Sequence, residues 1–237
     1  MSLLRGFAFQ VAFWIWSIVI NLAWLPSLLM PPMATVRGQT IWAYGVMVLL
    51  RVIAGIRYEI RGRENIPPGP VLIAAKHQSA WDTMIFHIIA RDPAIVMKAE
   101  LLKIPVYGWY CRHSRMIPID RDTGSAAIRT MIDAAKAAAT ANRPIVIFPQ
   151  GTRVAPGTSA PYLPGIAALY RQLGIPVVPV ALNSGIAWPR RSIRRQPGTI
   201  VLEYLPPIAP GLNRKDFMAK LEAAIEPAST RLAETAL

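Results

Sequence analysis

Hydrophobic residues follow one pattern in the N-terminal segment and another in the rest of the chain. Residues 6–36 contain no charged side chain, and apolar residues fill most of this run. A continuous helix ending at Leu25 would be about 28 Å long, just enough to cross the hydrocarbon core of a bilayer. A second apolar stretch at 41–56 is shorter and carries Arg51. The pattern predicts one long apolar helix and a second stretch that is too short and too polar for a span.

Three interpretations of residues 1–56 follow. A cleaved signal peptide would have a shorter apolar run and a small-x-small cleavage site after it, and neither condition is met. A pair of buried core helices is the alternative for a soluble protein. We favour a membrane anchor, either a helical hairpin or a partly embedded pair. Four of the seven tryptophans lie in the first 42 residues, as in segments that touch a membrane interface.

From residue 57 onward, short β-rich runs alternate with turns and with stretches of helical periodicity. The β-rich runs predict strands at 57–61, 71–75, 94–98, 116–120, 144–148, 176–181 and 199–204. Helical spacing predicts helices at 79–90, 125–141, 164–173 and 214–236. Strands that alternate with helices predict an α/β domain over residues 57–237, with helices layered on a largely buried sheet.

Composition and charge narrow the class of protein. With 53% hydrophobic and 16% charged residues among 237, a disordered chain is excluded. The single cysteine, Cys111, excludes an intramolecular disulfide, and with three histidines it leaves no cluster for a structural metal. The net charge of +13 favours anionic partners. A membrane surface fits better than nucleic acid, because no zinc-finger spacing, helix-turn-helix or aromatic RNA-binding pattern is present.

Candidate chemistry begins directly after the predicted strand 71–75. His77 follows the strand end, and Asp82 comes five residues later. If the loop folds back, Asp82 can accept from one imidazole nitrogen and leave the other free as a base for a hydroxyl group. Ser79 and Asp82 also have the spacing of a capping box, which explains both residues as helix-start chemistry. The two roles can coexist.

A second candidate is Phe-Pro-Gln-Gly-Thr-Arg at 148–153, which follows another apolar strand. Gly151 allows a positive φ or a close backbone approach, and Thr152 and Arg153 offer a hydroxyl group and a guanidinium group. Together they can hold a phosphate. An ordinary turn with a solvated arginine is the alternative.

Further basic residues lie near predicted strand ends and in a loop. Lys98 and Arg121 lie near the ends of two predicted strands and can converge on the same anion, or they can be ordinary surface charges. Residues 188–195 hold four arginines and a tryptophan. This loop can dock on an anionic membrane leaflet, which we favour, or on an acidic carrier protein.

The motifs, in this order and after an apolar N-terminus, resemble those of the glycerolipid acyltransferase family. The matching blocks are His77 and Asp82 for H-x4-D, 98–108 for K-x-E-L-x-x-x-P-x-x-G, 116–121 for an apolar block ending in arginine, 148–153 for F-P-E-G-T-R, and 175–180 for a last proline-containing block. The resemblance covers about residues 66–210. Three positions depart from the pattern: Lys76 replaces Asn, Gln150 replaces Glu, and Arg115 replaces a frequent Gly, which would add a cation beside the phosphate site.

The resemblance implies an α/β, layered sheet-and-helix acyltransferase domain preceded by an N-terminal hydrophobic helical membrane anchor. It also implies that His77, oriented by Asp82, takes the proton from the sn-2 hydroxyl of lysophosphatidic acid. The oxygen would attack the thioester of an acyl-coenzyme A or acyl-carrier protein, giving phosphatidic acid for phospholipid biosynthesis. The residues implied to bind the substrate are Lys98, Arg121, Gln150, Gly151, Thr152 and Arg153. No cofactor or metal is expected, because the thioester is already activated.

The expected location is the bacterial inner membrane, with the catalytic domain on the cytoplasmic side by the positive-inside rule. The alternatives are acyl transfer to another lysolipid, such as lyso-ornithine lipid, or a non-catalytic basic membrane-binding protein. A serine hydrolase is disfavoured, because the chain contains no G-x-S-x-G elbow.

Overall fold

The computed structural model describes residues 2–120 and 124–235. Its strands are β1 (Ile56–Arg61), β2 (Leu72–Ala75), β3 (Ala94–Lys98), β4 (Ile117–Ile119), β5 (Ile145–Ile147), β6 (Val177–Leu182) and β7 (Gly198–Tyr204). Its α-helices are α1 (Ser2–Ala23), α2 (Pro32–Leu49), α3 (Trp81–Ile89), α4 (Tyr107–His113), α5 (Ser125–Thr140), α6 (Pro164–Leu173), α7 (Ser184–Ala187) and α8 (Arg214–Glu234). Short helical turns are η1 (Leu25–Leu29), η2 (Leu50–Ala54), η3 (Arg63–Asn65) and η4 (Ala99–Lys103).

The seven strands form one sheet in the order β1-β7-β6-β2-β5-β3-β4. Neighbouring strands are parallel except for β6 and β7, which are antiparallel. The five strands β6, β2, β5, β3 and β4 therefore share one direction, and their carboxyl ends lie at the same edge of the sheet. In sheets of this kind, functional loops gather at that edge.

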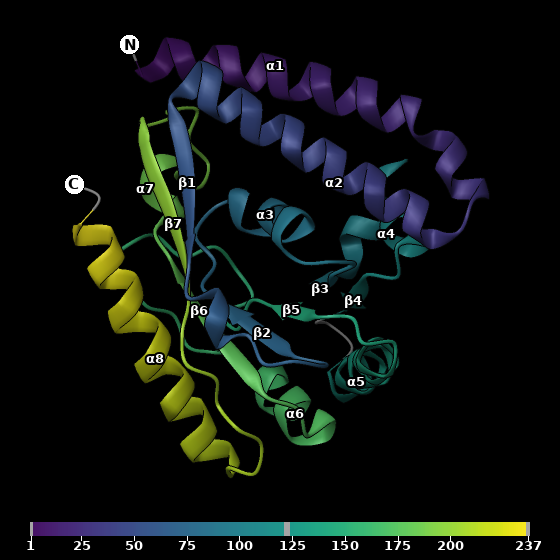
Figure 1. Cartoon of the computed structure of the whole chain (residues 1–237), viewed down its shortest axis with the longest axis vertical. Helices are drawn as coiled ribbons and strands as arrows, with labels where there is room; N and C mark the ends of the chain where they lie inside the picture. Colours follow the sequence, from purple (N-terminus) through teal and green to yellow (C-terminus); the bar gives the residue numbers. More distant parts are fainter. Residues whose placement is uncertain (1, 121–123, 236–237) are drawn as a thin grey trace.

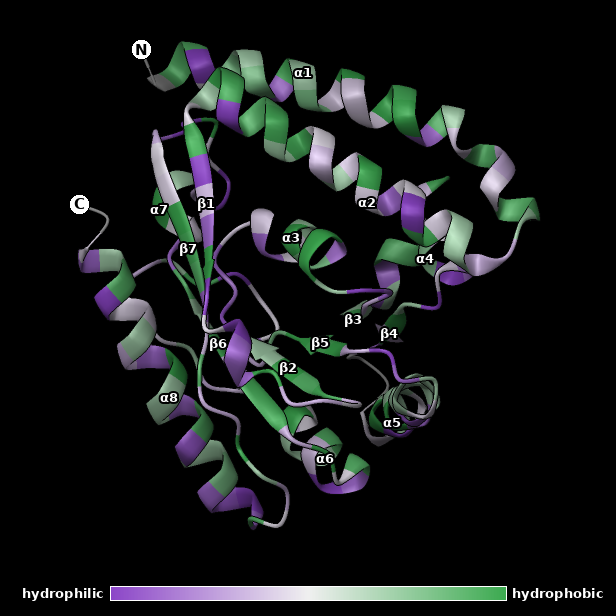
Figure 2. Cartoon of the chain, viewed as in Figure 1, coloured by the Kyte–Doolittle hydropathy of each residue, from purple (hydrophilic) through white to green (hydrophobic). Residues whose placement is uncertain are grey.

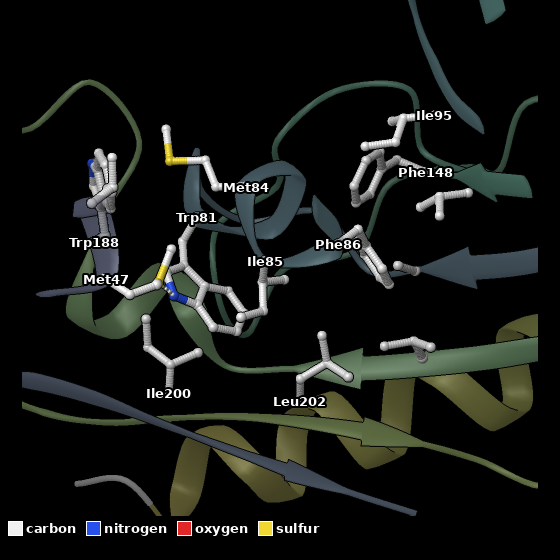
Figure 3. Close-up of a cluster of buried hydrophobic side chains, with 14 of the residues drawn as sticks. Met47, Trp81, Met84, Ile85, Phe86, Ile95, Phe148, Trp188, Ile200 and Leu202 are labelled. Atoms are coloured by element: carbon white, nitrogen blue, oxygen red, sulfur yellow. Dashed lines mark hydrogen bonds between the residues drawn. The ribbon is translucent and has the colours of Figure 1, made fainter. Parts of the chain in front are cut away.

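Both faces of the sheet are covered by helices. In β2, Ile73 belongs to a core cluster on the face of α1, α2 and α3, whereas Leu72 belongs to a cluster on the face of α5, α6 and α8 (Figure 1). In Figure 3, side chains of α3 such as Trp81 lie opposite Ile200 and Leu202 of β7. Strands buried on both faces form continuous apolar runs, and this is why the sequence pattern located them.

The two N-terminal helices lie side by side across the sheet domain (Figure 1). α2 begins at Pro32, well before the predicted stretch, because proline fits the first position of a helix. The indole of Trp16 donates a hydrogen bond to the Trp42 carbonyl at 3.0 Å, which ties α1 to α2. Phe9 of α1 is fully buried in the same core cluster as Ile73 of β2. The segment thus packs on the domain, and the division at residue 56 remains a prediction.

The opposite face of α1 is apolar and open. Figure 2 shows this helix largely in the colour of hydrophobic residues. Leu3–Ala23 has the length and composition of a membrane span. Only 17% of its apolar stretch is buried inside the protein. The exposed hydrophobic side chains of this helix are Leu3, Leu4, Phe7, Val11, Trp14, Ile15, Ile18, Val19 and Leu22.

All seven strands and the four helices predicted after residue 57 are confirmed, with the bounds of α6 as expected. The sequence pattern missed α4 and α7. α4 has seven residues and follows Val106, whose φ of 64° lies in the left-handed region that such a residue rarely adopts. Only Gly108, in the block that resembles K-x-E-L-x-x-x-P-x-x-G, marked this segment, and its role is structural: a Cβ there would lie 2.1 Å from the carbonyl oxygen of Leu102.

Replacing Gly108 with alanine is therefore expected to destabilise the protein by about 2 kcal/mol, because the backbone of η4 would have to move. For a chain of this size we expect the melting temperature in detergent to fall by about 4–8 °C. Gly165→Ala is the matched control, since its Cβ would meet only the Met131 Cε at 3.4 Å. Equal melting temperatures for Gly108→Ala and the wild type would contradict this account of α4.

Candidate functional site

The candidate residues gather because they follow the carboxyl ends of neighbouring parallel strands. His77 follows β2, and Gly151, Thr152 and Arg153 follow β5. Lys98 ends β3, the next strand in the sheet. All five residues line one cavity of about 930 Å³. The structure thus brings together most of the side chains that the sequence singled out.

His77 and Asp82 are in contact. The His77 Nδ1 lies 2.9 Å from Asp82 Oδ2, and the Asp82 side chain is fully buried. With Nδ1 donating to the carboxylate, Nε2 of a neutral imidazole is an acceptor and can take a proton. The His77 side chain is 13% exposed and lines the cavity, so a ligand there can reach it.

The Asp82 carboxylate also organises the start of α3. It accepts hydrogen bonds from the backbone N–H groups of Gln78 at 2.6 Å and Ser79 at 2.8 Å. The Ser79 hydroxyl in turn accepts from the N–H of Trp81 at 3.0 Å. The hydroxyl of Ser184, after β6, donates to the second carboxylate oxygen. Asp82 therefore serves the helix start and contacts His77 at the same time.

A ring contact and two hydrogen bonds hold His77 and its loop in place. The ring of Phe148 stacks on it with centroids 4.2 Å apart. The His77 carbonyl accepts from the N–H of Val154 at 2.8 Å, which fixes the β5 loop to the β2 loop. The loop after β6 is tied to the same place, because the N–H of Gly185 donates to Gln78 Oε1 at 3.0 Å. Fixed geometry of this kind favours acid–base chemistry.

A buried polar cluster lies behind the cavity and includes two positions that depart from the family pattern. Lys76 Nζ lies 2.6 Å from Glu226 Oε2 of α8, and the Lys76 side chain is only 2% exposed. The other Glu226 oxygen accepts from the Tyr162 hydroxyl at 2.8 Å and from Gln150 Nε2 at 3.5 Å. Gln150 is buried and is not among the residues that line the cavity. Its side chain therefore lies away from the substrate position that we expected for it.

The remaining basic candidates differ in position. Arg153 lines the cavity, and burial lowers its pKa, as does the nearby charge of Arg190, whereas Asp82 opposes the shift. Lys98 is half exposed at the cavity and lies 3.9 Å from Glu100. Arg121 lies outside the described residues.

Arg115 does not add a cation to this site, contrary to our expectation. Its guanidinium lies 3.2 Å from Asp92, and it is not among the residues that line the cavity. Its φ of 56° explains why glycine suits this position in the family pattern.

Most of the cavity lining is apolar. Its charged and titratable lining includes His77, Lys98 and Arg153, whereas aromatic and aliphatic side chains from several helices form most of the remainder. The apolar lining includes Phe13, Trp14, Trp24 and Trp42 of the N-terminal segment and Met84, Leu101, Ile128, Met131 and Ile166 of the domain. A largely apolar cavity with a few basic and polar side chains suits an amphipathic ligand.

Comparisons with known proteins agree with this geometry. The family model described as "Acyltransferase" matches residues 57–183. The chain belongs to this acyltransferase family. It is 38% identical over 159 residues to a 1-acyl-sn-glycerol-3-phosphate acyltransferase of Pseudomonas aeruginosa, a match over 67% of this chain and 62% of the relative. The chain therefore matches less than two thirds of that relative's length.

Two further comparisons cover more of this acyltransferase. A 1-acyl-sn-glycerol-3-phosphate acyltransferase of Limnanthes alba is 30% identical over 213 residues, which is 88% of this chain and 75% of the relative. The crystal structure of the 1-acyl-sn-glycerophosphate (LPA) acyltransferase PlsC from Thermotoga maritima matches with a TM-score of 0.79 at 20% identity. That match covers 99% of this chain and 98% of the other, and it shows the same fold.

Sequence reasoning missed three residues of the acyltransferase site, Gln78, Ser184 and Glu226, and it interpreted Arg190 as part of a docking loop. Ser184 had a usable signal, since it follows a buried strand end just as His77 does. Glu226 had no such sequence signal, because nothing in the local pattern of α8 distinguishes it from an exposed helical carboxylate. Cys111 lines the cavity but is buried, and burial raises its thiol pKa to about 11, which disfavours a role as a nucleophile.

His87, to which the sequence assigned no role, lies in the cavity wall, and burial lowers its pKa to about 4 from 6.5. The unfolded chain therefore binds more protons between these values, so stability is lost as the pH falls from about 6.5 to about 4. Burial of neutral His87 should lower the free energy of unfolding by about 3 kcal/mol between these pH values, and we expect this loss to be absent in His87→Gln. Unfolding free energies in detergent between pH 7 and pH 4 test this. Parallel curves for the variant and the wild type would contradict it.

Proposed function

We propose that this acyltransferase moves an acyl chain from a thioester to the sn-2 hydroxyl of lysophosphatidic acid, giving phosphatidic acid in phospholipid biosynthesis. The single observation that carries the proposal is the His77–Asp82 contact in a cavity lined by basic and by many apolar side chains. The acceptor combines the same two properties, with a phosphate at one end and an acyl chain at the other. The names of the relatives support this choice of acceptor.

In the reaction, His77 Nε2 takes the hydroxyl proton while the acceptor oxygen attacks the thioester carbonyl carbon. A C–O bond forms, the C–S bond breaks, and the thiol leaves with the proton from the imidazolium. Asp82 holds the ring and stabilises its positive charge. The backbone N–H groups and the Ser184 hydroxyl keep the carboxylate in place.

Arg153 and Lys98 bind the acceptor's phosphate, and Gly151 and Thr152 form the loop beside it. Gly151 has a φ of 65°, as the sequence motif allowed. The acceptor's acyl chain extends along the apolar wall. Arg121 belongs to the same proposal on the motif alone.

The acyl donor is acyl-coenzyme A or acyl-carrier protein, which acts as a co-substrate. The reaction requires no metal or further cofactor, because the thioester already carries an activated acyl group.

We propose that the protein lies on an anionic membrane, at the cytoplasmic side of the bacterial inner membrane, and the open apolar face of α1 supports membrane association. The helix is fixed to α2 and to the loop at Trp188, whose ring contacts Phe9 with centroids 5.2 Å apart. A helix that packs along its length on a folded domain can bury its outer face in the membrane–water interface, while the domain stays in water. The cavity wall formed by Trp14 then opens near the lipid.

An acceptor panel tests the proposed reaction. The purified chain in neutral detergent is offered lysophosphatidic acid, lyso-ornithine lipid and monoacylglycerol, each with both thioester donors. We expect acylation of lysophosphatidic acid, and the ratio of products from the two donors identifies the carrier. Acylation of lyso-ornithine lipid alone would overturn the choice of acceptor. No acylation of any acceptor would favour a non-catalytic membrane-binding protein.

A further inference from the structure

The four arginines in the loop after α7 lie in different environments. Arg195 is buried, with its guanidinium 4.5 Å from the centroid of the Trp188 ring and 5.3 Å from that of Phe9, and it helps to seat α1. Arg194 is exposed and does not line the cavity. Arg190 and Arg191 are exposed at the cavity, whose wall they share with His77 and Arg153.

From this arrangement we infer that Arg190, assisted by Arg191, forms an additional phosphate-binding element that makes the site selective for phosphomonoester headgroups. The inference rests on the proposed function and deepens it.

Hydrogen bonds fix Arg190 close to the reacting centre. Arg190 Nη1 donates to the carbonyl of Arg153 at 2.9 Å, and the next residue, Val154, donates its N–H to the His77 carbonyl at 2.8 Å. The short segment 153–154 thus links the arginine loop to the base. The helix that precedes this loop, α7, is joined to Asp82, because its first residue, Ser184, donates a hydrogen bond to the carboxylate.

No ion pair neutralises the positive charges at this place. Among the residues that the structure describes, Arg153, Arg190 and Arg191 take part in no ion pair. Burial lowers the pKa of Arg153 most and the charge of Asp82 raises it, while the smaller effect of the Arg190 charge lowers it, so the two cations repel each other. An anion between them removes this repulsion. A phosphomonoester, which carries up to two negative charges, suits two guanidinium groups better than a phosphodiester or a zwitterion.

The size of the acceptor agrees with this position. In lysophosphatidic acid the phosphorus lies about 5 Å from the sn-2 oxygen, because only two carbons and one oxygen separate them. The phosphate therefore stays beside His77 while the hydroxyl group reacts. The phosphate of a thioester donor is separated from its sulfur by the whole pantetheine arm, so it lies farther from this centre.

The test compares Arg190→Gln, Arg190→Lys and the control Arg194→Gln, which removes a charge from the same loop away from the cavity. In neutral detergent we expect Arg190→Gln to raise the KM for lysophosphatidic acid about 10-fold, as expected for a lost hydrogen bond to a charged group. The kcat and the KM for the donor should change less than about twofold. Arg190→Lys should recover part of the loss, and Arg194→Gln should match the wild type.

Failure of this inference and failure of the proposed function give different results. Lack of turnover of lysophosphatidic acid by the wild type would overturn the proposed function. In that case, equilibrium binding of lysophosphatidic acid to the wild type, Arg190→Gln and Arg194→Gln decides the inference, with about 10-fold weaker binding expected for Arg190→Gln alone. An unchanged KM or affinity in Arg190→Gln, or an equal loss in Arg194→Gln, would overturn it.

Discussion

Replacing His77 with alanine is expected to lower the kcat of acyl transfer by about 10²–10⁴-fold, the usual contribution of a positioned general base. The imidazole is the group that joins the buried carboxylate to the cavity, and alanine leaves no proton acceptor there. Acyl transfer to lysophosphatidic acid, measured at saturating substrate in detergent, gives the change directly.

Two controls separate catalysis from folding. His77→Gln keeps a side chain that can bond to Asp82 but cannot take up the proton, so it should lose as much activity as alanine. The melting temperatures of both variants should stay within about 4 °C of the wild type, since the ring is at the cavity surface. Substantial residual activity in either variant would show that another group acts as the base.

Replacing Lys76 with methionine is expected to destabilise the protein by about 3 kcal/mol. The change removes one partner of the 2.6 Å ion pair and leaves Glu226 without its counter-charge. We take the lower end of the range for broken buried pairs, because Glu226 is 20% exposed and retains its bond to Tyr162. Equilibrium unfolding in detergent measures the loss.

The double variant Lys76→Met/Glu226→Gln tests whether this loss comes from the broken ion pair. It leaves no unpaired charge, and the new amide carbonyl still accepts from Tyr162, so most of the lost stability should return. The single variant Glu226→Gln completes the comparison. A double variant whose loss of stability equals the sum of the losses in Lys76→Met and Glu226→Gln would mean that the two residues do not interact in solution.

The sequence predicted the regular elements well because the sheet is covered on both faces. Each buried strand, such as β5, is a short run of apolar residues between polar turns, and α5 has clear helical spacing. The short helix α4 was missed, because it depends on a left-handed residue at Val106 and on close packing at Gly108, and neither is visible as periodicity.

Part of the candidate site could also be predicted from the order of the strands and helices. Residues after the ends of parallel strands meet at one edge, so His77 and Arg153 could be placed together from the order of the elements. In the sequence, Lys76 and Gln150 are two separate departures from the family pattern, whereas both bond to Glu226 in the structure. That link joins residues about 75 and 150 positions apart, and only the packing of α8 against β6 creates it.

The most direct test of the central claim is positional analysis of the product formed from lysophosphatidic acid and a labelled acyl thioester. The wild type should give phosphatidic acid with the labelled chain at the sn-2 position, and His77→Ala should give almost none. Labelled phosphatidic acid formed equally by both proteins, or label found only on another lysolipid, would contradict the account.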